Sequence, residues 1–169
     1  MTFRNLYRKT AIALAVTGAL SGGQVIADDT DTLTVTAVVD ATCDITNVEV
    51  LNFGTLDLIN DATSSAEITW VCTNGFDTTI ALNGGRTGNI NNRNMLGSAN
   101  NDDLVYQLYT DAGLGTVFGD GANGSTVPAS GAGFGNPQTT TVYGEVLASD
   151  AQNVSADTYN DNVTVTITF

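Results

Sequence analysis

The stretch that decides the fold is residues 163–169, which read Val-Thr-Val-Thr-Ile-Thr-Phe. Apolar residues alternate there with threonines, and a period of two places one set of side chains against a core and the other in water. Valine, isoleucine and threonine are branched at Cβ, which favours the extended backbone of a half-buried strand. The stretch therefore predicts a β-strand whose apolar face carries Val163, Val165, Ile167 and Phe169.

The same alternation recurs in residues 32–39, near the other end of the chain. One face of that segment carries Leu33, Val35, Ala37 and Val39, and the other carries Thr32, Thr34, Thr36 and Val38. The segment predicts a second amphipathic strand. The pattern by itself leaves open whether this strand pairs within its own domain or with another molecule.

Between these two segments the chain reads as short strands separated by turns. We expect further strands at residues 48–53, 66–72, 78–82, 104–110 and 140–147. Asn-Gly pairs at Asn74, Asn83 and Asn123 mark turns, because both residue types accept a positive φ cheaply. The Gly/Asn/Ser-rich intervals 84–101 and 119–135 are predicted to be loops. Short strands with frequent turn signals predict an all-β fold, an antiparallel sandwich or barrel.

Residues 1–27 are predicted to be a secretory signal peptide. Three basic residues (Arg4, Arg8 and Lys9) precede an apolar run at 10–20, and small residues lead up to Ala27. That layout is typical of a cleaved export signal. The remaining 142 residues are enough for one domain with a substantial core.

The charge balance excludes several classes of partner. Residues 28–169 carry 18 acidic residues against Arg86 and Arg93, a formal charge of −16. Phosphate backbones and anionic membrane surfaces are bound through lysine and arginine, so we expect no nucleic acid and no membrane partner.

Cys43 and Cys72 are the two cysteines of the chain, and both lie in the exported part. An oxidising compartment favours a disulfide between them. It would close a loop of about 30 residues and stabilise the fold by roughly 3–4 kcal/mol in the chain-entropy model.

Catalysis and metal binding are the weaker interpretations. The sequence has no histidine, and its single lysine, Lys9, would leave with the signal peptide; a nucleophile would then lack its usual base. A carboxylate pair among Asp102, Asp103 and Asp120 remains open, as does calcium at residues 100–103 or 120–124. Neither loop fits the Asp-x-Asp/Asn-x-Asp/Asn-Gly calcium loop that ends in a glutamate. We expect no enzyme, no cofactor and no metal.

Three further side chains have expected places. Trp70 lies two residues before Cys72 in an alternating run, and we expect it in the core beside the disulfide. Arg86 and Arg93 fall in a predicted loop, where ion pairs with surface acids would each contribute only about 0–1 kcal/mol.

Six stretches together resemble the spore coat protein U domain family. They are residues 38–43 (VVDATC), 51–56 (LNFGTL), 106–111 (YQLYTD), 119–121 (GDG), 142–146 (VYGEV) and 158–169 (TYNDNVTVTITF). Their order and spacing are kept over nearly all of the exported part. The sequence departs from the family pattern at Phe118, Glu145 and Asp157, where tryptophan, a basic residue and glycine are frequent.

The resemblance implies a subunit of an archaic, Csu-type chaperone–usher pilus. Such a subunit is an incomplete immunoglobulin-like β-sandwich, completed by a donor strand from a neighbouring subunit. Residues 28–40 would then be an N-terminal donor-strand extension, and residues 41–169 the pilin domain. Leu33, Val35, Ala37 and Val39 would donate, and Val163, Val165, Ile167 and Phe169 would line the acceptor groove that contacts the chaperone.

The partners that the resemblance implies are a periplasmic pilus chaperone, an outer-membrane usher, and copies of this chain or related pilins. The product would be an extracellular pilus that supports adhesion or biofilm formation, with no small-molecule substrate. Two alternatives stay open: a secreted spore or envelope coat component, and a self-sufficient sandwich that binds carbohydrate through its long loops.

Overall fold

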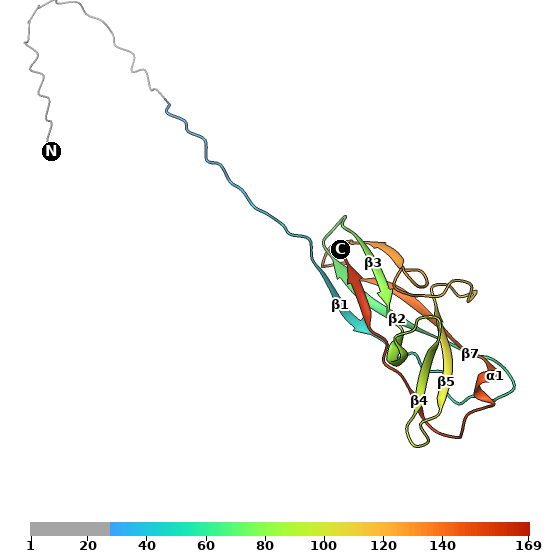
Figure 1. Ribbon diagram of the computed structural model, residues 1–169. Helices are drawn as coiled ribbons and strands as arrows, with labels where there is room; N and C mark the ends of the chain where they lie inside the picture. The colour runs from blue at the N-terminus through green and yellow to red at the C-terminus, as the bar shows by residue number, and fades with distance from the viewer. Residues whose placement is uncertain (1–27) are drawn as a thin grey trace, which may run out of the picture. The chain divides into compact units, whose positions relative to one another are not determined.

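The computed structural model describes residues 28–169, and the signal peptide predicted at residues 1–27 lies outside them. The described chain falls into two units, one ending at Ala37 and the other covering Val38–Phe169. The second unit contains all of the assigned strands and helical turns (Figure 1).

The second unit is built almost entirely from strands. In chain order the elements are β1 (Cys43–Val48), β2 (Ala62–Cys72), β3 (Asp77–Leu82), the 3-10 turn η1 (Gly85–Thr87), β4 (Arg93–Gly97), β5 (Asp103–Tyr109), β6 (Val127–Ser130), β7 (Gln138–Val146), the short helix α1 (Ala148–Ala151), β8 (Tyr159–Asn160) and β9 (Val165–Thr168). One sheet has the order β1-β2-β7-β5-β4-β8, and the other has the order β6-β3-β9. All these strand pairs are antiparallel. The predicted all-β sandwich is therefore confirmed.

The core lies between the two sheets and is assembled from alternate residues of their strands. Its buried members are Ile68, Trp70, Cys72, Ile80, Leu82, Leu104, Tyr106, Leu108, Phe118, Val142, Val146 and Ala151. The indole N–H of Trp70 donates to the hydroxyl of Thr140 on β7, 3.1 Å away, so its one polar atom is satisfied. The expected disulfide is present and joins Cys43 to Cys72, which face each other across β1 and β2.

Most of the predicted central strands are confirmed, with one clear error. The strands expected at 66–72, 78–82, 104–110 and 140–147 correspond to β2, β3, β5 and β7. The strand expected at 48–53 is wrong, because β1 ends at Val48. The side-chain oxygen of Asn52 accepts the N–H of Gly54 at 2.8 Å, and Gly54 has a φ of 68°. This turn interrupts the extended backbone that a strand over 48–53 would need.

Two strands lie inside intervals that the sequence predicted to be loops. β4 lies within 84–101, and β6 lies within 119–135. β4 reads Arg-Asn-Met-Leu-Gly, which has no period of two. Its pairing with β5 and β8 on either side is set by tertiary contacts that the local pattern does not report.

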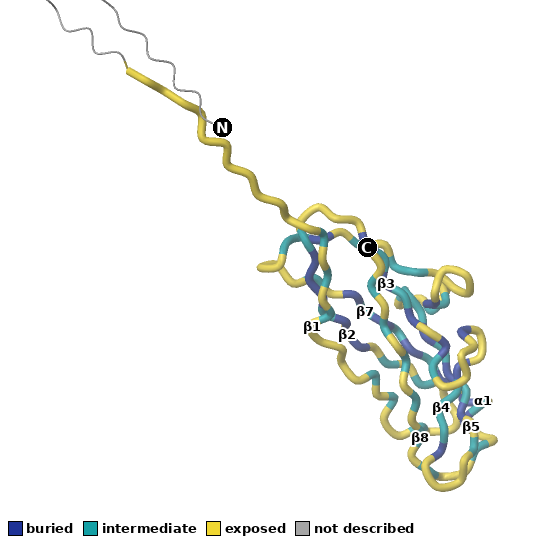
Figure 2. The backbone as a smooth tube through the Cα atoms, turned by 60° about the vertical axis from the view of Figure 1, so that its left-hand side comes forward, coloured by how far each residue is buried: buried dark blue, intermediate teal, exposed yellow. Residues whose placement is uncertain are grey.

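Residues 32–39 form no strand in the structure, although their alternation is regular. Residues 28–40 are exposed throughout, as Figure 2 shows in yellow. The side chains of Leu33, Val35 and Val39 are 82–86% exposed. Because a β-strand is defined by its hydrogen bonds to a neighbour, an amphipathic segment without one stays unassigned. Residues 32–39 are therefore unassigned in the structure, and whether they pair within their own domain or with another molecule stays a prediction.

Candidate functional site

β9 is an edge strand, and its outer edge has no partner among residues 28–169. Thr164, just before it, accepts the N–H of Asn83 at 3.1 Å and donates its own N–H to the Asn83 side chain at 2.8 Å. Both backbone groups of Thr164 therefore point toward β3. Since these groups alternate in direction along a strand, those of Val165 and Ile167 point to the open side. Such an edge is a template for an added strand.

The predicted acceptor residues mostly face the core from this edge. Val163, Val165 and Ile167 are half-buried and pack against the core, while the threonines between them are exposed. Phe169 differs, because 54% of it is exposed and its ring meets Phe76 edge to face, with centroids 6.4 Å apart. Of the four predicted residues, Val163 and Val165 line the groove described next, whereas Ile167 packs against the core further along β9 and Phe169 lies at its end.

A groove opens beside β9 and exposes part of the core. It has a volume of about 480 Å³, and residues 48–51 and Phe53 line its other side. Apolar side chains from both sheets also line it: Ala66, Ile68, Leu82, Met95, Leu108 and Val142. An apolar trough next to an unpaired strand edge has the two features that strand addition uses, main-chain hydrogen bonds and pockets for alternate side chains.

The wall opposite β9 depends on a glycine in β7. A Cβ at Gly144 would lie 2.9 Å from side-chain atoms of both Leu51 and Phe53. Neighbouring positions of β7 that face inward, Val142 and Val146, carry buried valines. The missing side chain at Gly144 therefore lets the irregular segment after β1 pack onto the sheet and form the wall.

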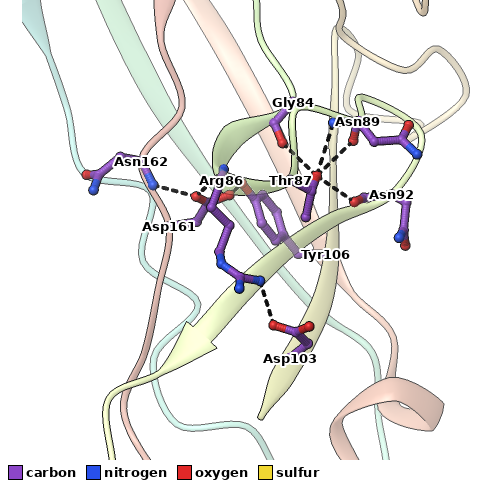
Figure 3. Close-up of polar contacts among 9 residues, drawn as sticks. All are labelled: Gly84, Arg86, Thr87, Asn89, Asn92, Asp103, Tyr106, Asp161 and Asn162. Carbon is purple, nitrogen blue, oxygen red and sulfur yellow. Dashed lines mark hydrogen bonds and ion pairs between the residues drawn. The ribbon is translucent and has the colours of Figure 1, made fainter. Parts of the chain in front are cut away.

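A polar network lies where the chain enters β9 (Figure 3). One Asp161 carboxylate oxygen accepts the hydroxyl of Tyr106 at 2.7 Å, and the other accepts the N–H groups of Arg86 and Asn162 at 2.8 and 2.7 Å. Burial raises the pKa of Tyr106 well above its ordinary value, and the bond to Asp161 raises it further. Both Tyr106 and Asp161 line the groove. No local pattern marks these two residues as part of a site, although both lie in stretches that carry the family resemblance.

The prediction that Arg93 lies in a loop and pairs with surface acids is wrong. The residue lies in β4 with 0% of its surface exposed. Its guanidinium donates to the carbonyl of Asn83 at 2.8 and 3.1 Å, to the carbonyl of Phe118 at 2.8 Å and to the Gln107 side chain at 2.6 Å. Burial lowers its pKa, and the nearby groups Tyr106, Asp161 and Asp120 oppose that effect. Arg86 behaves as expected, in an exposed pair with Asp103.

The aspartates considered for catalysis or calcium hold loops in place. Asp120 accepts the N–H groups of Ala122 and Asn123 at 2.9 and 2.7 Å, and Asp102 accepts the N–H of Ser155 at 2.9 Å. Hydrogen bonding to the side chain and then the backbone of Ser155 lowers the pKa of Asp102, and the bond from the backbone N–H of Asn123 lowers that of Asp120, whereas a general acid needs a raised pKa. Residues 28–169 contain no metal-type cluster of histidine, cysteine and acidic side chains. No helix in the described part could cross a membrane.

The predicted donor residues lie on one exposed, alternating segment. Leu33, Val35 and Ala37 belong to the first unit, and Val39 belongs to the second. Their large side chains are the most exposed apolar groups of the described chain together with Val38 and Val50. Exposed apolar patches of this kind mark interaction sites.

Comparison with known proteins agrees with the architecture. A chain of the chaperone–tip adhesion subunit pre-assembly complex CsuC-CsuE, from the archaic chaperone–usher Csu pili of Acinetobacter baumannii, has a similar fold. The TM-score is 0.55 and the identity 21%, over 78% of this chain and 40% of that one. The present chain thus spans less than half of that protein's length.

A comparison of sequences identifies a relative with higher identity and a matching family model. Protein U of Myxococcus xanthus is 35% identical over 132 residues, which cover 70% of this chain and 71% of Protein U. The model of the Spore Coat Protein U domain matches residues 29–166. The chain therefore belongs to the Spore Coat Protein U domain family.

Proposed function

We propose that this protein is a structural subunit of a surface pilus and polymerises by donor-strand exchange. Residues 33–39 of one copy fill the groove beside β9 of the next. One observation carries the proposal: the same chain has an apolar groove with an unpaired strand edge and an exposed segment with the matching alternation. Because the two surfaces differ, the contact is heterologous and extends into a filament.

The energetics favour a tight contact. Leu33, Val35, Ala37 and Val39 would exchange water for the groove, at roughly 1.5–3 kcal/mol for each large side chain. Each ladder hydrogen bond along Val165 and Ile167 adds about 0.5–1.5 kcal/mol net. The total is on the order of 10 kcal/mol before the cost of ordering the tail.

The proposal includes a route of assembly. Residues 1–27 direct export and are removed, residues 28–40 form the donor extension, and residues 41–169 form the acceptor domain. A periplasmic chaperone covers the groove until an outer-membrane usher exchanges it for the tail of the next copy or of a related pilin. The resulting extracellular fibre supports adhesion or biofilm formation.

Deletion of residues 29–39 in the producing cell tests the proposal. We expect no filaments by electron microscopy and no SDS-resistant ladder that collapses on boiling, because each subunit keeps its groove but loses its donor. A synthetic peptide of residues 28–40 should bind the deleted chain.

Two results would contradict the proposal. Filaments formed by the deletion variant would show that residues 29–39 are not the donor. A folded monomer that ignores the peptide would favour the self-sufficient binding domain or the coat component instead.

A further inference from the structure

One side chain, Tyr106, contacts both walls of the groove. It lies on β5, is almost fully buried and lines the cavity. Its ring meets Phe53 edge to face, with centroids 6.5 Å apart and planes at 61°. Its hydroxyl donates to Asp161 at 2.7 Å. Phe53 belongs, with residues 48–51, to one wall, and Asp161 belongs to the wall that leads into β9.

The Asp161 end of this connection is held in place by the backbone around it. The backbone N–H groups of Arg86 and Asn162 donate to the carboxylate, as Figure 3 shows. Gly85 has a φ of 60°, and a Cβ there would collide with the Asp161 carboxylate. A glycine at this position is therefore what lets the carboxylate lie against the η1 turn.

A second chain of hydrogen bonds supports the same point of the fold. The side-chain oxygen of Asn83 accepts the backbone N–H groups of both Gly85 and Thr164, at 3.0 and 2.8 Å. Its backbone carbonyl accepts two bonds from the buried guanidinium of Arg93. The start of β9 is therefore tied to β3, β4 and η1, and the Tyr106 hydroxyl extends these ties to β5.

We propose that Tyr106 is a spacer that holds the groove at the width of a β-strand before a donor arrives, acting through Asp161 and Phe53. The inference rests on the proposed function and names the residues that regulate strand entry at the same site. A groove already ordered at the right width loses less freedom on binding, so the donor binds more tightly and enters faster. Without the tie, the wall before β9 relaxes into the apolar trough that the donor has to occupy.

Substitution of the tyrosines of β5 tests the spacer. The acceptor is the exported chain, residues 28–169, carrying Val35→Asp so that it cannot donate to itself. A fluorescent peptide of residues 28–40 reports association and dissociation by anisotropy. Tyr106→Phe removes only the hydroxyl, and its matched control is Tyr109→Phe. Tyr109 lies on the outer face of the same strand, and its hydroxyl donates to Glu145 at 3.0 Å.

We expect Tyr106→Phe to weaken peptide binding about tenfold, the size of effect that loss of a hydrogen bond to a charged group produces. Tyr109→Phe should leave binding unchanged. Asp161→Asn should weaken binding similarly, and the double variant should be no worse than either single one, because both remove the same tie. Amide exchange at residues 163–169 of the free acceptor should also be faster in Tyr106→Phe.

The outcomes separate the two proposals. If the peptide does not bind the acceptor with Tyr106 intact, donor-strand exchange through residues 33–39 is wrong. If it binds that acceptor but binds Tyr106→Phe equally well, or if Tyr109→Phe weakens it as much, the spacer is wrong and the proposed function stands. Should Asp161→Asn fail to fold, the comparison between Tyr106→Phe and Tyr109→Phe still decides.

Discussion

Two segments of this chain have nearly the same sequence pattern and different structures. Residues 33–39 and residues 163–169 each place four apolar residues at every second position. The second contains β9, which pairs with β3 and turns Val165 and Ile167 toward the core. The first has no assigned secondary structure and exposes its apolar side chains.

Alternation therefore specifies an amphipathic segment but does not supply its hydrogen-bonding partner. β9 gains both a neighbour on one side and a core beneath it, because β3 and the six-stranded sheet lie within the same domain. Residues 33–39 have no assigned strand partner. The two segments become equivalent only when a second copy contributes the missing surface, which is the proposed function.

An aspartate on the apolar face of either segment should have the largest effects that we expect. The property that it changes should differ between the two segments. Val35→Asp should abolish filaments while leaving the free energy of unfolding unchanged, because the side chain is exposed in the monomer. Ile167→Asp should lower the free energy of unfolding by about 3 kcal/mol, because it brings a charge against the core. Electron microscopy and urea denaturation measure the two effects.

The controls for this comparison are Thr36→Asp and Thr166→Asp, which place the charge on the other face of each segment. Both should assemble and unfold like the parent chain. A destabilised Val35→Asp monomer would mean that residues 33–39 already pack within their own domain.

Removal of the disulfide should destabilise the domain that contains β9 and should leave residues 33–39 unaffected. The double change Cys43→Ser and Cys72→Ser should lower the free energy of unfolding by roughly 3–4 kcal/mol, since it releases a loop of about 30 residues. Denaturant titration of the oxidised parent and the variant measures the loss. If peptide 28–40 binds the variant at a temperature where it is still folded, the groove does not depend on the bond.

A smaller effect is expected from the wall that faces β9. Gly144→Val should cost about 1–3 kcal/mol of stability through overpacking against Leu51 and Phe53, and should also weaken the binding of peptide 28–40. The control is Glu145→Gln, at the next position of β7 and on its outer face. Unchanged peptide binding by a destabilised Gly144→Val would show that this wall does not shape the acceptor site.

The smallest expected effect is a change in how stability falls at low pH. Hydrogen bonds from the backbone N–H groups of Ala99 and then Asn100 lower the pKa of Asp157 below its ordinary value of 3.8. A lowered native pKa contributes stability that is fully present above the unfolded value and is lost as the pH falls toward the native one. The parent should therefore lose stability below about pH 4, and Asp157→Asn should lose less over that range. Urea titrations at pH 7 and pH 3 measure the loss of stability in each protein. An equal loss in the parent and in Asp157→Asn would contradict this prediction.

Several parts of the fold could be predicted from local pattern because their causes are local. Alternation located β2, β3, β5 and β7, and two cysteines allow a single intramolecular pairing. Trp70 was placed in the core by its position within an alternating run. The strand expected at 48–53 was wrong because the turn at Asn52 and Gly54 overrides the apolar run around it.

Local sequence is enough to predict the central strands, the disulfide and the negative charge, because each follows from the order and type of neighbouring residues. Three features follow from the assembled fold alone: Arg93 is buried, Tyr106 and Asp161 meet across 55 positions of sequence, and a groove opens beside β9. Burial and hydrogen bonding of a polar side chain depend on which distant segments surround it. A period of two carries information about the faces of a strand, but not about what lies against them.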